Sequence, residues 1–227
     1  MGAIRRRRIL EVGSDNARSR TVITQTTIES GLLIRPVARF VAIGLFLMAF
    51  FTTLWALWAL YGLPTVVAVV LVAIFVALSV IFVINGVQLI RSASMLPVPS
   101  SEESQRRGRA MQLGFGITFA SEGVIIAVVC ALLGMSGADA YFGPAIALVV
   151  GLHFIPFGFI FHRTIDFYIA GWVVIWAVIG IWLIASRPID PALVGSLVAV
   201  ATACGTAAYG IYMLRIKRAI LGALARS

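Results

Sequence analysis

The hydrophobic residues of this chain fall into six long, continuous runs separated by short polar segments. A membrane core of about 30 Å is spanned by a helix of roughly 20 apolar residues, and each run reaches that length. The runs do not alternate between apolar and polar residues at period two, which excludes strands as the main element. The pattern therefore predicts an all-α, polytopic bundle of six transmembrane helices, over residues 40–61, 65–90, 111–134, 141–161, 167–186 and 191–214.

The basic residues indicate which ends of the spans face the cytoplasm. Of the 18 Lys and Arg residues, all but Arg187 lie before the first span, between the second and third, between the fourth and fifth, or after the sixth. Segments rich in Lys and Arg stay on the cytoplasmic side of a membrane. We therefore expect both termini to be cytoplasmic. The opposite connectors are short (Gly62–Pro64, Met135–Ala140 and Arg187–Asp190), so we expect neighbouring spans to form three hairpins.

The segments outside the six-span domain, residues 40–214, are polar and basic. Residues 1–39 form an Arg-rich cytoplasmic arm that we expect to be largely disordered, with a short helix near residues 27–40. The arm is longer than the basic start of a signal peptide and precedes a full span, so we expect no cleavage. Residues 215–227 form a basic cytoplasmic tail. Between the second and third spans, Ser100 precedes two glutamates in the manner of a helix N-cap, which predicts a short interfacial helix.

Composition agrees with a membrane location. Hydrophobic residues make up 61% of the 227 positions and charged residues 12%, whereas soluble domains are about half apolar and a quarter charged. The net charge of +9 does not indicate nucleic-acid binding, because the basic residues flank apolar spans and no base-stacking module accompanies them. We expect the partners to be the lipid bilayer and its anionic headgroups. The two cysteines, Cys130 and Cys204, lie inside apolar runs, and we interpret both as small buried hydrophobes.

Glu122 is the most informative residue, because it lies near the middle of the third predicted span. A carboxylate at that depth costs about 2.5–3.5 kcal/mol to insert, so it marks either a functional site or a buried hydrogen-bonded group. His153 is its expected partner: the two residues lie about 16 Å and about 12 Å from the inner ends of adjacent spans. Pro156 cannot donate a backbone hydrogen bond, which frees a carbonyl oxygen near His153. Asn85 and Thr118 complete a candidate intramembrane polar site, unless they serve only as interhelical hydrogen-bond contacts.

The last predicted span carries a face of small residues. Gly195, Ala199, Ala203 and Ala207 recur at four-residue spacing. Such a face lets a second helix approach closely. We therefore expect this span to lie at the centre of the bundle or at the interface of a homo-oligomer.

Two other patterns are weaker. Residues Gly134–Gly137 match the Gly-x-Ser-Gly motif of rhomboid intramembrane proteases, a family that also has six spans. That family takes its catalytic base from a histidine in span six, and the sixth span here contains no histidine, so we interpret the segment as a turn. His162 and Asp166 are spaced for one helix face, but two ligands alone make a weak metal or acid–base site. We interpret them as part of a solvated connector.

The segment Gly151–Pro156 (Gly-Leu-His-Phe-Ile-Pro) resembles one found in small multi-pass, six-helix inner-membrane proteins of bacteria. The resemblance implies a bacterial inner (plasma) membrane and no particular chemistry. Three functions remain open. A non-enzymatic role in the envelope, in assembly or in sensing is favoured, because the sequence shows no complete catalytic or nucleotide-binding motif. The alternatives are a small proton-coupled transporter or channel that uses Glu122 and His153, and an intramembrane enzyme. We expect no catalytic residue, metal or cofactor.

Overall fold

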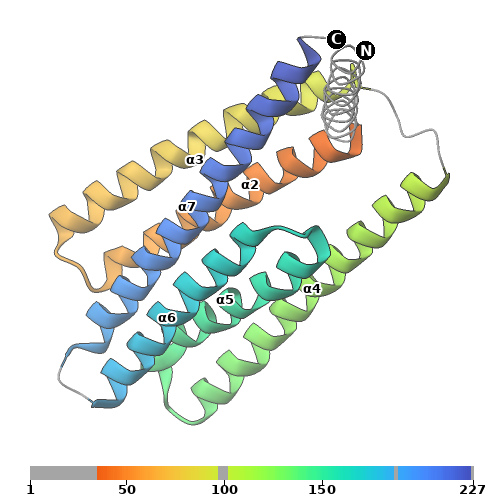
Figure 1. The fold of residues 1–227 in the computed structure, drawn as a ribbon. Helices are drawn as coiled ribbons and strands as arrows, with labels where there is room; N and C mark the ends of the chain where they lie inside the picture. The colour runs from red at the N-terminus through yellow and green to blue at the C-terminus, as the bar shows by residue number, and fades with distance from the viewer. Residues whose placement is uncertain (1–34, 97–101, 187–188, 226–227) are drawn as a thin grey trace, which may run out of the picture.

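The computed structural model describes residues 35–96, 102–186 and 189–225. Within these residues the fold is all-α, without strands, and six helices are long and apolar enough to cross a membrane (Figure 1). The prediction of six apolar helices is confirmed. Two 3-10 turns, η1 (Trp58–Tyr61) and η2 (Asp139–Tyr141), accompany the long helices α2 (Arg35–Leu57), α3 (Thr65–Ala93), α4 (Glu102–Met135), α5 (Phe142–Phe161), α6 (Thr164–Ser186) and α7 (Pro191–Leu224).

Helix α7 is the centre of the bundle. It packs against α2, α3, α5 and α6, and 67% of its apolar stretch is buried, against 6% for α4. The small-residue face predicted on this helix is buried inside the chain, which explains why four neighbours can approach it. This confirms the central position. The homo-oligomer stays a prediction, and it would need a surface other than this face.

Close approach to α7 depends on two of its glycines. A Cβ atom on Gly210 would lie 2.3 Å from the Phe82 ring of α3, and one on Gly205 would lie 3.2 Å from the Val173 side chain of α6. The first distance is far shorter than any van der Waals contact, so α3 can pack this closely only against glycine.

Helices α4 and α7 extend farthest beyond the predicted spans. Helix α4 begins at Glu102, so the interfacial helix expected before the third span is continuous with it. Helix α7 continues ten residues past Leu214, through the basic segment that we predicted as a tail. Hydropathy reports where apolar side chains end, whereas backbone hydrogen bonding continues into polar sequence. Residues 1–34, which make up most of the predicted N-terminal arm, lie outside the described residues.

The Gly134–Gly137 segment ends α4 as a turn, as predicted. Gly137 adopts a φ of +68°, which favours glycine. The Ala138 N–H donates to the Leu133 carbonyl at 2.8 Å, and the Gly137 N–H donates to Gly134 at 3.2 Å. This is the hydrogen-bond pattern that closes helix C-termini. The Ser136 hydroxyl also donates to the Leu133 carbonyl, so its environment is that of a turn residue and not of a nucleophile.

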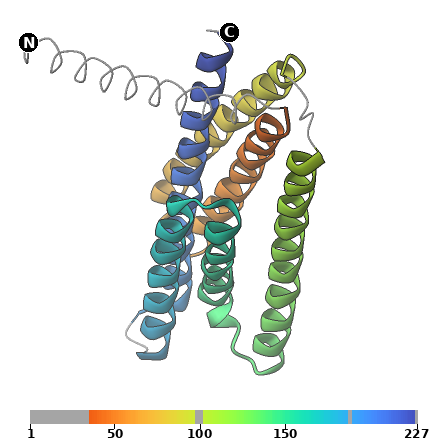
Figure 2. The same ribbon diagram turned by 45° about the vertical axis from the view of Figure 1, so that its right-hand side comes forward.

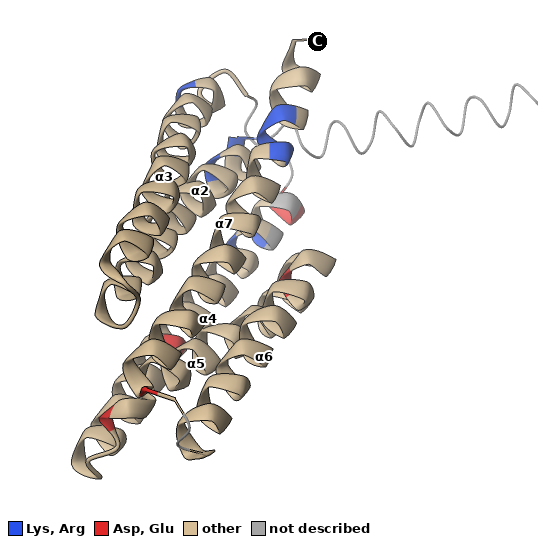
Figure 3. Cartoon of the chain, turned by 90° about the vertical axis from the view of Figure 1, so that its left-hand side faces the viewer, with Lys and Arg blue, Asp and Glu red and all other residues tan. Residues whose placement is uncertain are grey.

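Basic side chains gather at one end of the bundle, the end on which the C-terminus lies (Figure 3). There Arg35 donates to the carbonyls of Ser94 at 2.9 Å and Leu96 at 3.2 Å, which joins the start of α2 to the end of α3. A cation at a helix C-terminus also complements the helix dipole.

Candidate functional site

Glu122 of α4 and His153 of α5 face each other inside the helix bundle. The Glu122 Oε1 and His153 Nδ1 atoms are 3.3 Å apart, and their side chains are only 6% and 12% exposed. This contact was predicted from the similar depths of Glu122 and His153, counted from the inner ends of their adjacent spans. The approach falls short of hydrogen-bond alignment, so His153 Nδ1 is a buried nitrogen without a hydrogen-bond partner among the described residues.

Aromatic rings surround the imidazole. The His153 ring lies 4.4 Å from that of Phe154 and 5.1 Å from that of Phe157, measured between ring centroids. Water is therefore largely excluded, and a charge on either member of the pair would be poorly solvated. The pair is stable either as two neutral groups or as a carboxylate beside an imidazolium. These two states differ by the transfer of one proton over the short distance between the two groups.

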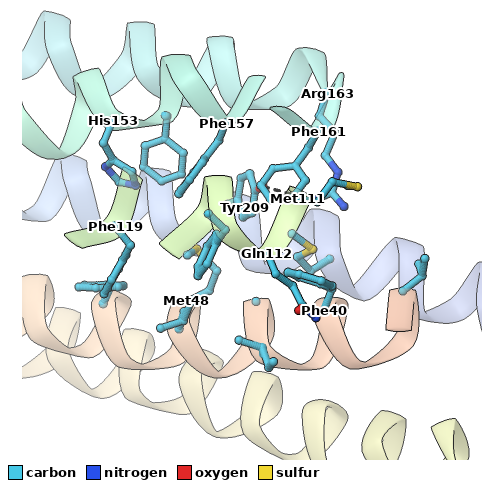
Figure 4. Close-up of a pocket in the computed structure, with 18 of the residues that line it drawn as sticks. Phe40, Met48, Met111, Gln112, Phe119, His153, Phe157, Phe161, Arg163 and Tyr209 are labelled. Atoms are coloured by element: carbon cyan, nitrogen blue, oxygen red, sulfur yellow. Dashed lines mark hydrogen bonds between the residues drawn. The ribbon is translucent and has the colours of Figure 1, made fainter. Parts of the chain in front are cut away.

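The pair lies beside a cavity of about 580 Å³ that extends between α2, α4, α5 and α7. This volume is within the range of about 300–1,000 Å³ that is typical of small-molecule sites. Figure 4 shows His153 and Phe119 at one end of the cavity, with Gln112 and Arg163 towards the other. Phenylalanine is the most frequent residue of the lining, with Phe40, Phe51, Phe115, Phe119, Phe154, Phe157 and Phe161.

Aromatic contacts across the cavity join α4 to its neighbour α5 and also to α2, with which it otherwise makes little contact. The Phe115 ring of α4 stacks on that of Phe157 of α5 with centroids 5.2 Å apart. The Phe119 ring of α4 meets the Phe51 ring of α2 at 6.1 Å. Offset and edge-to-face contacts of this kind contribute about 0.5–1.5 kcal/mol each beyond area burial. They hold α4 across the cavity while leaving space between the rings.

Helix α4 is the peripheral wall of the cavity. Among the long helices it packs mainly against α5, and Figure 2 shows it standing apart from the other five. Its outward face exposes large apolar side chains, including Leu113, Ile117 and Val124. An exposed apolar face of this extent on a spanning helix is the surface that contacts lipid tails.

At the end remote from Glu122, a chain of hydrogen bonds connects the cavity to a buried carboxylate. The Tyr209 hydroxyl lines the cavity and donates to Asp166 Oδ1 at 2.8 Å, and Arg163 donates to that hydroxyl at 3.5 Å. Asp166 is 0% exposed, and its Oδ2 has no hydrogen-bond partner among the described residues. The prediction of a solvated connector is therefore wrong for Asp166, because α6 begins at Thr164 and turns this side chain towards α7.

His162 and Asp166 do not share one helix face as part of a common site. His162 is exposed and adopts a φ of +50° where it ends α5, whereas Asp166 is buried against Tyr209. The two side chains therefore face different environments. No signal in the sequence indicated that Asp166 would be buried. The connector before α6 is only two residues long, and the partner Tyr209 is 43 residues away along the chain.

Of the other two candidate polar residues, Asn85 lies in a different cluster from the Glu122–His153 pair, and Thr118 lies one turn before Glu122 on α4. Asn85 of α3 accepts a hydrogen bond from Lys217 of α7 at 2.7 Å, and Gln88 accepts from the same ammonium at 2.6 Å. This buried lysine holds α3 to α7 in a separate cluster. Thr118 does not line the cavity, and its carbonyl accepts a bond from Ser121 one turn along α4. The candidate site thus reduces to Glu122 and His153 with the cavity beside them.

In the described part of the chain, no group of three His, Cys, Asp or Glu side chains is arranged to hold a metal ion. Comparisons of the chain with protein-family models, curated proteins and solved structures found no match. The class defined by the fold and site is therefore a six-helix membrane protein with a buried acid–imidazole pair at an internal cavity.

Proposed function

We propose that this chain is a small proton-coupled transporter, in which Glu122 and His153 bind and release the coupled proton. The observation that carries the proposal is the 3.3 Å contact between the carboxyl and the imidazole beside a cavity of about 580 Å³. A buried acid–base pair on membrane-spanning helices is expensive to insert, and such residues commonly form proton relays. In this proposal the chain is not an enzyme.

The physical basis of coupling is the charge of the pair. Adding or removing one proton changes the net charge of an enclosure whose walls are largely aromatic, where a net charge is poorly solvated. Any ligand in the adjoining cavity therefore changes the free energy of protonation, and by linkage protonation changes the affinity for that ligand. Reciprocal coupling between two sites is the minimum that a proton-linked carrier needs.

We further propose that the protein lies in a bacterial inner membrane with both termini in the cytoplasm. The distribution of Lys and Arg along the sequence and their grouping at one end of the bundle support this orientation. Reporter fusions to the C-terminus test it. A fusion that is active only in the cytoplasm agrees with the proposal, and activity of a periplasmic reporter contradicts it.

The transport proposal is tested in proteoliposomes that contain a trapped pH-sensitive dye. We expect an imposed pH gradient to relax faster with the wild-type protein than in empty vesicles. Glu122→Gln and His153→Ala should each slow that relaxation at least tenfold. The chain supplies matched controls: Asp139→Asn changes an exposed carboxylate, and His162→Ala removes the second, exposed histidine. Both controls should relax at the wild-type rate.

A flux that survives both site substitutions would remove the pair from the mechanism. An absence of flux in every variant, including the wild type, would instead favour the non-enzymatic envelope, assembly or sensing role that the sequence favoured.

A further inference from the structure

The two ends of the cavity differ in charge. Arg109 of α4 and Arg163, directly after α5, line one end, and Glu122 is the acidic side chain of the lining. Glu122 lies 13 residues along α4 from Arg109, and His153 lies ten residues along the chain from Arg163. At 1.5 Å per residue the first separation is about 20 Å, and the eight residues of α5 from His153 to Phe161 span about 12 Å. The cavity is therefore an elongated apolar volume with its positive charge at one end.

Neither arginine directly contacts an acidic side chain among the described residues, although Asp166 attracts Arg163 across the Tyr209 hydroxyl that bonds to both. In the part of the chain that the structure describes, neither guanidinium forms an ion pair, and the hydrogen bond recorded for Arg163 goes to the neutral Tyr209 hydroxyl. Arg163 also lies over the Phe161 ring, 5.1 Å from its centroid, which fixes the guanidinium at the cavity wall. Guanidinium groups bind phosphate with strong, charge-assisted hydrogen bonds.

The length of the cavity matches one leaflet of a bilayer. Half of a hydrocarbon core of about 30 Å is about 15 Å, which lies between the separation of about 12 Å along α5 and that of about 20 Å along α4. A phosphate at the arginines therefore places an acyl chain along the phenylalanine side chains of the lining, with its end near the Glu122–His153 pair. A lipid that enters from the membrane has only one helix to pass. That helix is α4, one wall of the cavity, and only 6% of its apolar stretch is buried.

We propose that the cavity binds one anionic phospholipid of the surrounding membrane. Its phosphate is held by Arg109 and Arg163, and one acyl chain occupies the space between α2, α4 and α5. This inference does not rest on proton transport, because a lipid can occupy the cavity whether or not the pair conducts protons. If the transport proposal also holds, then the lipid is the substrate or a resident cofactor of the same site.

Binding is measured with the purified full chain in neutral detergent, by titration with fluorescent phosphatidylglycerol and, separately, fluorescent phosphatidylcholine. We expect phosphatidylglycerol to bind at least tenfold more tightly. The Arg109→Gln/Arg163→Gln variant should reduce that affinity roughly tenfold or more, the equivalent of one or two lost charge-assisted hydrogen bonds. The matched control Arg215→Gln/Arg218→Gln removes the same charge from exposed positions that do not line the cavity, and should bind like the wild type.

A second pair of variants tests the cavity itself. Gly108 lines the cavity and Gly123 faces outward on the same helix, and a Cβ atom would meet nothing within 4 Å at either position. Gly108→Phe should therefore fill the cavity and abolish lipid binding, whereas Gly123→Phe should leave it unchanged. Because both glycines have open space around them, both variants are expected to fold. Circular dichroism and elution volume verify this.

Four results would overturn the proposal. Equal affinity for the two lipids would remove the role of the arginines, and equal behaviour of the two phenylalanine variants would remove the cavity. Competition by inorganic phosphate alone at lipid-like concentration would show an ion site with no place for an acyl chain. If Gly108→Phe instead dissociates a dimer and leaves lipid binding intact, a second copy of the chain occupies the cavity. Lipid binding is measured in detergent without a pH gradient, and proton flux is measured in proteoliposomes without labelled lipid, so the two proposals fail separately.

Discussion

The hydrogen bond from Tyr209 to Asp166 offers a sharp test of the packing between α6 and α7. Replacing Tyr209 with Phe removes the hydroxyl that donates to Asp166 Oδ1 at 2.8 Å and keeps the ring. Asp166 is 0% exposed, and its second carboxylate oxygen already lacks a hydrogen-bond partner among the described residues. The substitution therefore leaves a buried carboxyl without its tyrosine donor.

The expected loss of stability follows from that burial. Leaving a buried polar group unsatisfied costs about 1–3 kcal/mol, whereas interhelical hydrogen bonds in membrane proteins average about 0.6 and reach about 1.7 kcal/mol. Because water does not reach Asp166, we expect Tyr209→Phe to lower the free energy of unfolding by about 1.5 kcal/mol. The neighbouring Tyr212, whose ring lies 6.1 Å from that of Tyr209, provides the matched control. Tyr212→Phe should change stability by less than about 0.5 kcal/mol.

The assay is equilibrium unfolding in mixed micelles with increasing denaturing detergent, followed by circular dichroism. A double-mutant cycle with Asp166→Leu, which removes the acceptor, isolates the pairwise energy, which we expect to be about 1 kcal/mol. Equal stabilities of the Tyr209→Phe and Tyr212→Phe variants, or a coupling energy of zero, would refute the assignment of this hydrogen bond as a buried contact between α6 and α7.

Two further substitutions test the centre of the bundle by the same assay. Gly210→Ala should lower stability by about 1–2 kcal/mol, because its Cβ would lie 2.3 Å from the buried Phe82 ring and overpacking outweighs the gain in helix propensity. Gly171→Ala, where a Cβ meets nothing within 4 Å, should instead be neutral or stabilising, and a loss at both sites would contradict the steric argument. Lys217→Met removes a buried ammonium that donates two hydrogen bonds to α3 and should cost about 2 kcal/mol. Substitution of the exposed residue, Arg218→Met, should leave the free energy of unfolding unchanged. An equal loss of stability in both variants would show that Lys217 does not link α3 to α7.

The six helices could be predicted because continuous apolar length is a strong signal that needs no tertiary information. Their ends could not, because Leu214 is the last apolar residue of its run while α7 remains hydrogen-bonded to Leu224. The continuation of α4 back to Glu102 has the same cause, since a helix that leaves the apolar region loses its hydropathy signal but keeps its backbone geometry.

The candidate site shows the limit of reasoning from depth. Counting residues from the inner ends of two adjacent spans correctly paired Glu122 with His153. Depth does not determine which way a side chain points around the helix axis, and Asn85 faces Lys217 in a separate cluster. The burial of Asp166 was missed for a related reason, because its partner Tyr209 is 43 residues away along the chain on another helix.

We propose above all that Glu122 and His153 bind and release a proton within the membrane. Infrared difference spectroscopy of the reconstituted protein between two pH values tests it most directly, because a protonated carboxyl has its own C=O stretching band. The account predicts a pH-dependent carboxyl band that disappears in Glu122→Gln, shifts in His153→Ala and is unchanged in the exposed control Asp139→Asn. A spectrum in which Glu122→Gln leaves every carboxyl band as in the wild type would contradict the claim.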